Sequence, residues 1–405
     1  MEKESLSFSK NINASPAEAY RAFTNSTALR EWMCDVATTQ PRVGGRIYLA
    51  WNDGYYASGE YKELEPDKKL VFTWHGRGEP ATSMVEATFE SKDGSTTIDL
   101  VHEGIGEGPE WGQTRQEIEK GWEYALENLA SVFETGEDLR LVRRPMLGIT
   151  VGDFNQEIAK ALNIPVKEGI RLDTTIEGMG AATSGLQSGD VIVGIDGQDA
   201  STWSGLANAL QSHQAGDEVE VAFYRGPEKK TVTMKLSGRP IPEIPWSAAE
   251  LAQAVSKNYI EAEKALDKFF QGVTEEQASF KPSPDEWSLK ENVAHLIHSE
   301  RGWHTWLSDL VEGMESHYDD FGGNVQAKIA GTVAAFPTLE ALREELRRSQ
   351  TETTAMLAAL PDEFISGKAS YWRVAFNMLQ TDFHIEGHLE QMRTVLDAAK
   401  AAQPA

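Results

Sequence analysis

The sequence has little cysteine: Cys34 is the single one among 405 residues. One thiol cannot close a disulfide within the chain, so we expect a fold that is stable without disulfides and a reducing compartment. Cys34 follows Trp32 and Met33 in an apolar run, and this position favours a small buried side chain over a nucleophile.

Basic runs and long hydrophobic runs are also missing. The net charge of −25 argues against the phosphates of nucleic acids and against anionic membrane surfaces as partners. No stretch approaches the roughly 20 consecutive apolar residues of a transmembrane helix, and residues 1–4 lead into an alternating pattern without the apolar core of a signal peptide. We therefore expect a cytoplasmic protein that binds neither nucleic acid nor membrane.

A hydrophobic share of 40% and a charged share of 25% are typical of a folded chain, and the length favours two or three domains. Two segments have the composition of linkers, residues 139–145 and the proline-rich residues 237–245. Proline restricts its predecessor to extended conformations, so the second segment is expected to be a semi-rigid spacer. The predicted domains are residues 1–138, 146–236 and 247–400.

Residues 1–138 predict an α+β domain. Ser15-Pro16-Ala17-Glu18 is a capping box with proline at the first helical position. Strand-like patterns follow at residues 46–51, 57–64, 70–74, 83–90 and 96–102. From Thr114 the period becomes helical, with one apolar stripe made by Ile118, Trp122, Leu126, Leu129 and Phe133. An antiparallel sheet that packs on this helix is a helix-grip fold.

Several motifs of this segment resemble the START-like (SRPBCC) superfamily, and within it the homologues of the activator of the heat-shock-chaperone ATPase. They are residues 12–20, Val43-Gly44-Gly45, Gly59-Glu60-Tyr61, residues 70–74 and Gly121-Trp122. The resemblance implies an apolar cavity for a hydrophobic small molecule. Aromatic walls suit such a cavity, and the candidates to line it are Trp32, Trp51, Trp74 and Trp122; the alternative is that these side chains are core.

Residues 146–236 resemble a PDZ domain of the HtrA-protease type and are expected to be β-rich. The motifs are Met146-Leu147-Gly148-Ile149, residues 178–192, Ile195-Asp196-Gly197 and residues 216–221. Such domains bind a C-terminal peptide by adding it as a strand to a sheet edge. The resemblance assigns the carboxylate loop to residues 146–149 and the opposite wall to Leu206 and Leu210. The alternative is a PDZ fold that serves only as a spacer.

Residues 247–400 predict an all-α four-helix bundle. Amphipathic patterns cover residues 247–271, 289–313, 338–360 and 373–400, and capping boxes begin at Ser247 and Ser288. His384 and His388 are four residues apart on the last helix, so they share one helix face. Facing helices of a bundle point ligands at each other, and His295 on the second helix could complete a three-histidine site. Three neutral imidazoles suit Zn²⁺, Ni²⁺ or Fe²⁺ and leave coordination positions open.

This segment resembles the DinB superfamily, which includes bacillithiol-transferase and mycothiol-dependent isomerase relatives. The motif Trp287-Ser288-Leu289-Lys290-Glu291 precedes His295, and His384-Ile385-Glu386-Gly387-His388 supplies the pair. The resemblance implies that these three histidines bind the metal. His298 departs from the family pattern and could be a fourth ligand, a proton-transfer group or a rim residue. Glu300 or Glu390 could orient a ligand imidazole.

Two functions are compatible with these patterns. The resemblance implies a metal-dependent thiol S-transferase or detoxifying enzyme with a low-molecular-weight thiol as cosubstrate, and the metal site by itself also allows hydrolysis. The alternative is a non-catalytic adaptor that binds a hydrophobic small molecule and a C-terminal peptide. A homodimer through the bundle is compatible with both.

Overall fold

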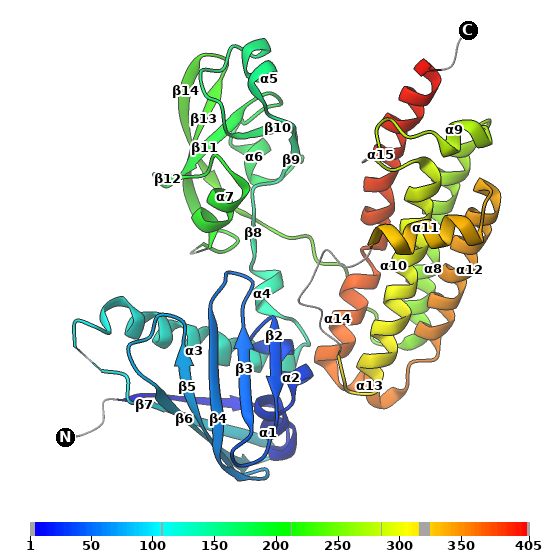
Figure 1. Ribbon diagram of the computed structural model, residues 1–405. Coiled ribbons are helices and arrows are strands. Elements are labelled where there is room, and N and C mark those ends of the chain that lie inside the picture. Colours follow the sequence, from blue (N-terminus) through cyan, green and yellow to red (C-terminus); the bar gives the residue numbers. More distant parts are fainter. Residues whose placement is uncertain (1–4, 107, 212, 285, 316–324, 403–405) are drawn as a thin grey trace. The chain divides into compact units, whose positions relative to one another are not determined.

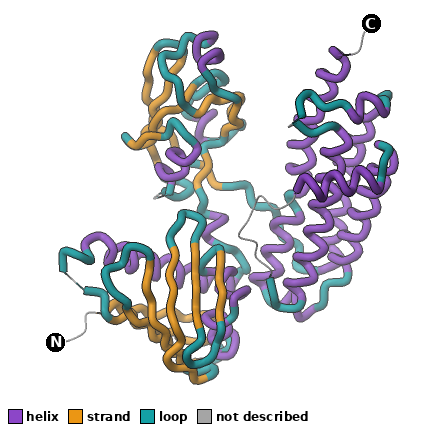
Figure 2. The backbone as a smooth tube through the Cα atoms, viewed as in Figure 1, coloured by secondary structure: helices purple, strands orange, loops and turns teal. Residues whose placement is uncertain are grey.

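The computed structural model describes residues 5–106, 108–211, 213–284, 286–315 and 325–402 (Figure 1). The chain divides into two units. One contains residues 1–138 and 242–405, and the other contains residues 139–241. Strands concentrate before residue 240 and helices after it, as the colours of Figure 2 show. Among the described helices, none combines the length and the apolar composition that crossing a bilayer requires.

Alternation of apolar and polar residues builds the first sheet; in β7, for example, buried and half-buried side chains alternate along the whole strand. The seven strands are antiparallel in the order β1-β7-β6-β5-β4-β3-β2. Asp93 and Gly94 both have positive φ and join β6 to β7 in a two-residue hairpin. The strands are β1 (Ser5–Ile12), β2 (Val36–Thr39), β3 (Arg46–Ala50), β4 (Tyr56–Glu65), β5 (Lys69–Gly76), β6 (Ser83–Lys92) and β7 (Ser95–Glu103).

Three helices complete this domain: α1 (Pro16–Thr24), α2 (Ser26–Trp32) and α3 (Gly112–Glu134). The capping box of Ser15 and Glu18 is present at the start of α1. Figure 1 shows α3 across one face of the sheet, and four residues of the predicted stripe, all except Phe133, are buried there. The α+β helix-grip prediction is confirmed.

The second unit is built on a small β-sheet, as predicted for residues 146–236. Its strand order is β14-β13-β11-β10-β9, with β12 beside β11, and β8 pairs with β15. The elements are α4 (Leu139–Val142), β8 (Pro145–Met146), β9 (Ile149–Gly152), α5 (Gln156–Ala161), β10 (Ile170–Thr175), α6 (Gly180–Thr183), β11 (Val191–Ile195), β12 (Gln198–Asp199), α7 (Trp203–Leu210), β13 (Glu218–Arg225), β14 (Glu228–Lys235) and β15 (Ser237–Gly238).

The C-terminal segment is all helical. Its core is formed by the apolar faces of α8, α10, α12 and α15, which Figure 1 shows side by side. The helices are α8 (Ala248–Phe270), α9 (Glu275–Ser279), α10 (Leu289–Val311), α11 (Val325–Ala335), α12 (Leu339–Ala358), α13 (Asp362–Ser366), α14 (Lys368–Met378) and α15 (Thr381–Ala402).

The fourth predicted helix differs from the structure, because residues 373–400 are not continuous. Helix α14 ends before Leu379, and α15 begins at Thr381. The carbonyl of Leu379 accepts a hydrogen bond from Asn258 of α8, and the hydroxyl of Thr381 donates to the carbonyl of Met378. At the break, these side chains therefore satisfy two carbonyls with tertiary and local side-chain hydrogen bonds.

Within the unit that holds both the first and the C-terminal segments, α14 contacts the end of α3. Lys368 donates a hydrogen bond to the carbonyl of Glu134. A Cβ atom on Gly136 would lie 2.7 Å from the carbonyl oxygen of Lys368 and 2.8 Å from the Cβ of Trp372, so only glycine permits this approach. The two segments are thus packed closely enough to exclude a methyl group.

Candidate metal centre

The start of α10 is fixed by local hydrogen bonds that place His295 two turns into the helix. Ser288 accepts a hydrogen bond from the backbone N–H of Glu291, whose carboxylate accepts from the backbone N–H of Ser288. Lys281 forms an ion pair with the same carboxylate. The capping box predicted from the sequence is therefore present, and it fixes where α10 begins.

The structure brings His295 of α10 together with His384 and His388 of α15. Nε2 of His384 lies 3.3 Å from Nε2 of His295 and 3.1 Å from Nε2 of His388. Two nitrogens that bind one tetrahedral ion at about 2.0–2.1 Å lie about 3.3 Å apart, so the spacing fits a shared metal. Within the described residues, the group of side chains close enough to hold one ion consists of these three histidines.

Partial desolvation within the cluster keeps the three imidazoles uncharged at neutral pH. Desolvation and the neighbouring histidines lower the pKa of His295 to about 4, and desolvation also lowers the pKa of His384 and His388. A neutral imidazole has a free lone pair, which is the form that binds a metal. His384 is exposed and the other two are half-buried, so solutes can reach the cluster.

Trp287, one residue before the cap of α10, covers one side of the cluster. Its ring centroid lies 5.0 Å from that of His295, and it stacks on His388 at 6.4 Å. An indole supplies no ligand atom, so it shields this side from water without competing for the metal. The sequence motif drew attention to Trp287, but its position over the histidines results from the packing of α10 on α15.

The side chains that orient His388 were not those expected. Its Nδ1 lies 3.1 Å from Oδ1 of Asn292 and 3.2 Å from Oε1 of Gln391. Glu300 instead accepts hydrogen bonds from Tyr259 and Thr353, and Glu390 pairs with Arg393. The signal for Asn292 was its spacing, because it lies three residues before His295 on the same helix face.

His298 is not part of the cluster. Its Nε2 lies 2.7 Å from the hydroxyl of Thr332 and 3.0 Å from the carbonyl of Lys328, both on α11. The sequence left three roles open for His298: a fourth ligand, a proton-transfer group or a rim residue. Because α11 holds the side chain, its position supports the role of a rim residue.

In the second unit, four of the six predicted peptide-binding residues belong to one apolar cluster. Leu147 and Leu206 are buried in it, and Ile149 and Leu210 pack against it. Met146 instead pairs with Ser237 in the two-stranded sheet. Gly148 has a φ of +77°, and β9 is the last strand of its sheet, so one edge of β9 is free of described strands.

Of the four tryptophans predicted to line a cavity, Trp32, Trp74 and Trp122 are buried in the core of the first domain, and the half-buried Trp51 packs against it. Trp74 packs against Trp51 and Trp122, and Trp32 packs against Phe23. Every indole N–H of the four donates to a protein acceptor. Their role in ligand binding stays a prediction.

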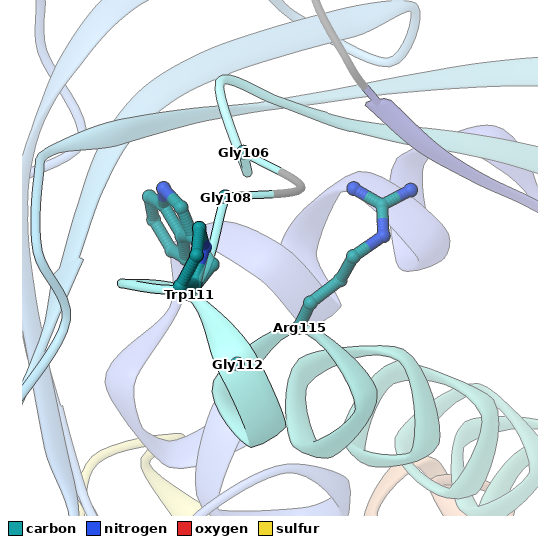
Figure 3. A pocket seen from close by; sticks show the side chains of 6 residues that line it. Gly106, Gly108, Trp111, Gly112 and Arg115 are labelled. Carbon is teal, nitrogen blue, oxygen red and sulfur yellow. The ribbon is translucent and has the colours of Figure 1, made fainter.

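A pocket of about 370 Å³ lies at the start of α3, and other residues line it. Figure 3 shows the Trp111 ring and the Arg115 side chain on either side of the glycine-containing loop at Gly106 and Gly108. Sequence reasoning did not single out these residues.

Comparisons with known proteins match three segments of the chain to three different families. Residues 13–134 match the family described as Activator of Hsp90 ATPase homolog 1-like protein. Residues 145–236 match the PDZ domain, and residues 258–392 match the DinB superfamily. The chain carries an AHSA1 (SRPBCC) domain, an HtrA-like PDZ domain and a DinB domain. The three-histidine cluster thus belongs to the DinB domain.

Similar proteins match one domain each. The AHSA1 domain is 30% identical over 137 residues to the human Activator of 90 kDa heat shock protein ATPase homolog 1; the match covers 33% of this chain and 38% of the human protein. The PDZ domain is 32% identical over 95 residues to a probable periplasmic serine protease do/HhoA-like of Haemophilus influenzae; the match covers 24% of this chain and 20% of that protein. The chain therefore spans well under half the length of these relatives.

Among solved structures, an HSP90 activator from Plasmodium falciparum is 24% identical. The similarity covers 32% of this chain and 94% of that chain, with a TM-score of 0.29.

Proposed function

We propose that the DinB domain binds one divalent transition metal, Zn²⁺, Ni²⁺ or Fe²⁺, through His295, His384 and His388. The observation that carries this proposal is the convergence of three Nε2 atoms with separations of 3.1 and 3.3 Å. Three protein ligands leave at least one coordination position open, which is the arrangement of a catalytic site.

The reaction proposed for this site is transfer of a low-molecular-weight thiol to an electrophile. A metal bound there would supply Lewis acidity, which lowers the pKa of a thiol in the open position. The thiol sulfur forms a bond to the electrophilic carbon, the leaving group departs with its bonding electrons, and the thiol proton passes to solvent. Hydrolysis by an activated water is the competing reaction at the same site.

The chain's own residues have defined parts in this proposal. The exposed position of His384 leaves the cluster open to a thiol and an electrophile from solvent. Trp287 excludes water from the opposite side of the cluster, where its ring lies on His295 and His388. Neutral imidazoles hold the cation without competing protons at pH 7.

The other two domains are proposed as recognition modules. The PDZ domain would bind the C-terminus of a partner at the free edge of β9, beside Leu147, Ile149, Leu206 and Leu210. The AHSA1 domain would take a hydrophobic small molecule. If the DinB domain binds no metal, the chain acts as an adaptor through the PDZ and AHSA1 domains alone.

The test begins with metal content, measured by mass spectrometry on untagged protein after exposure to Zn²⁺, Ni²⁺ and Fe²⁺. We expect about one equivalent in the wild type and in the control His75→Ala, which changes an exposed histidine of β5, and almost none in His384→Ala/His388→Ala. Loaded protein is then assayed for thiol consumption with 1-chloro-2,4-dinitrobenzene. If the wild-type protein binds no metal, only the adaptor function remains. If it binds metal but transfers no thiol, the result favours hydrolysis as the reaction of this site.

A further inference from the structure

Asn292 lies at the interface of the two helices that carry the histidine cluster, and its side chain is fully buried. It contributes no atom to the group that could hold a metal. Its amide nitrogen Nδ2 donates to the carbonyl of Ser288, one turn earlier on α10, at 3.0 Å. Its amide oxygen Oδ1 lies 3.1 Å from Nδ1 of His388.

The hydrogen bond to Ser288 determines which way the amide points. A carbonyl oxygen only accepts, so the group that faces Ser288 must be the amide nitrogen, and Oδ1 faces His388. An oxygen of an amide also only accepts. The short contact with His388 is therefore satisfied when Nδ1 of that ring carries the proton and donates it to Asn292.

Protonation at Nδ1 leaves the lone pair of the neutral ring on Nε2, the atom that points into the cluster. The opposite tautomer would place a hydrogen between Nε2 and the ion. We propose that Asn292 is a positioning residue that holds His388 in the metal-binding tautomer and orientation; this inference rests on the metal site proposed above.

Gln391 is a weaker partner for the same atom. Its Oε1 lies 3.2 Å from Nδ1 of His388, but its side chain is exposed on α15, so water can replace it. A buried acceptor has no such replacement, because removing it leaves the donor without a partner. Substituting Asn292 is therefore expected to weaken Zn²⁺ binding strongly, and substituting Gln391 only slightly.

The test compares Asn292→Leu, Asn292→Asp and Gln391→Leu with the control Asn377→Ala. Asn377 of α14 makes the same type of bond, from its side-chain amide to the carbonyl of Arg373 four residues earlier, outside the cluster. Zn²⁺ affinity is measured by competition with a chromophoric chelator, and thermal unfolding of the metal-free proteins checks that each variant is folded.

We expect Asn292→Leu to bind Zn²⁺ about 10- to 100-fold more weakly, the usual effect of removing a partner of a ligand histidine. Asn292→Asp still accepts from Nδ1 but loses the donor to the carbonyl of Ser288, so its Zn²⁺ affinity is expected to lie between those of the wild type and Asn292→Leu. The control is expected to be unchanged. Equal losses in Asn292→Leu and Asn292→Asp would show that only packing matters and would overturn the inference, and so would full affinity in Asn292→Leu.

The tautomer is measured independently of the metal, by long-range nitrogen–proton NMR correlations of His388 in metal-free protein. We expect Nδ1–H in the wild type and a mixture of tautomers in Asn292→Leu. If the wild type shows Nδ1–H but binds no metal, the metal site fails while the role of Asn292 in fixing the ring stands. If the wild type binds Zn²⁺ and the metal-free ring carries its proton on Nε2, the inference fails and the metal site stands.

Discussion

The hydroxyl oxygen of Ser83 lies 2.7 Å from Nε2 of His102, in the interior of the AHSA1 domain. Such a pair invites comparison with a nucleophile and its general base. However, the indole N–H of Trp122 donates to Nδ1 of His102, so the proton of the neutral ring is on Nε2 and is donated to Ser83. A general base must direct a lone pair at the hydroxyl of the nucleophile, whereas Nε2 of His102 carries a proton. The two residues therefore form a buried structural pair.

The same burial makes the AHSA1 domain sensitive to acid. Desolvation lowers the pKa of His102 from 6.5 to about 4. Between these two values the unfolded state binds more protons than the folded state, so the free energy of unfolding decreases as the pH falls from about 6.5 to about 4. We expect a loss of about 2 kcal/mol between pH 7 and pH 5, measured by urea denaturation.

The variant His102→Gln retains a donor and an acceptor but does not titrate, so its loss between pH 7 and pH 5 should be smaller by that amount. The exposed His75→Gln serves as the control and should behave as the wild type does. Equal pH dependence in all three proteins would contradict the assignment to His102.

Removal of the metal should destabilise the DinB domain. A ligand that binds only the folded state stabilises it by about 2.7 kcal/mol at a free concentration of 100 times its dissociation constant, which corresponds to about 5–10 °C in the unfolding temperature. We expect Zn²⁺ to raise the unfolding temperature of chelator-treated protein by this amount.

The variant His384→Ala/His388→Ala should show no such increase. An equal increase in this variant would mean that Zn²⁺ binds elsewhere in the chain.

Peptide binding to the PDZ domain should depend on Gly148. Its φ of +77° disfavours any side chain, and a Cβ atom there would lie 2.3 Å from the Cβ of Met179. Gly148→Ala must therefore shift the loop, and we expect at least a tenfold loss of affinity for a peptide with an apolar C-terminal residue, measured by fluorescence anisotropy.

The same peptide with an amidated C-terminus is the matched probe, because strand addition depends on capture of the carboxylate. Equal binding of both peptides would argue that the domain does not recognise C-termini.

An ion pair between Arg225 and Asp190 should support the PDZ fold. The guanidinium binds both carboxylate oxygens at 2.7 Å, and Asp190 is only 1% exposed. Removing the guanidinium leaves the buried carboxylate with only the backbone N–H of Gln187 as a partner, so Arg225→Ala is expected to lower the free energy of unfolding by roughly 3 kcal/mol.

Arg171→Ala is the comparison, since it removes a pair with the exposed Asp173 and a hydrogen bond to the carbonyl of Asp153, and it should cost about 1 kcal/mol. If denaturant titrations show similar losses in the free energy of unfolding for the two substitutions, the burial of the Asp190 carboxylate does not determine the effect.

Interactions over a few residues could be predicted from the sequence, because they depend on the chain's own spacing. The capping boxes at Ser15 and Ser288, the hydrophobic stripe of α3 and the shared face of His384 and His388 are of this kind. The three domain resemblances also rested on local motifs, and the comparisons confirm them.

Contacts between residues far apart in the chain were decided only by the tertiary structure. Asn292 and His388 are 96 residues apart, and only the packing of α10 on α15 shows that the amide, and not Glu300, orients the ring. Glu300 faces α8 and α12 instead, where Tyr259 and Thr353 satisfy it. Helical spacing restricts a side chain to a face of its own helix, but which neighbour that face meets depends on how the helices pack, and the sequence pattern does not contain this information.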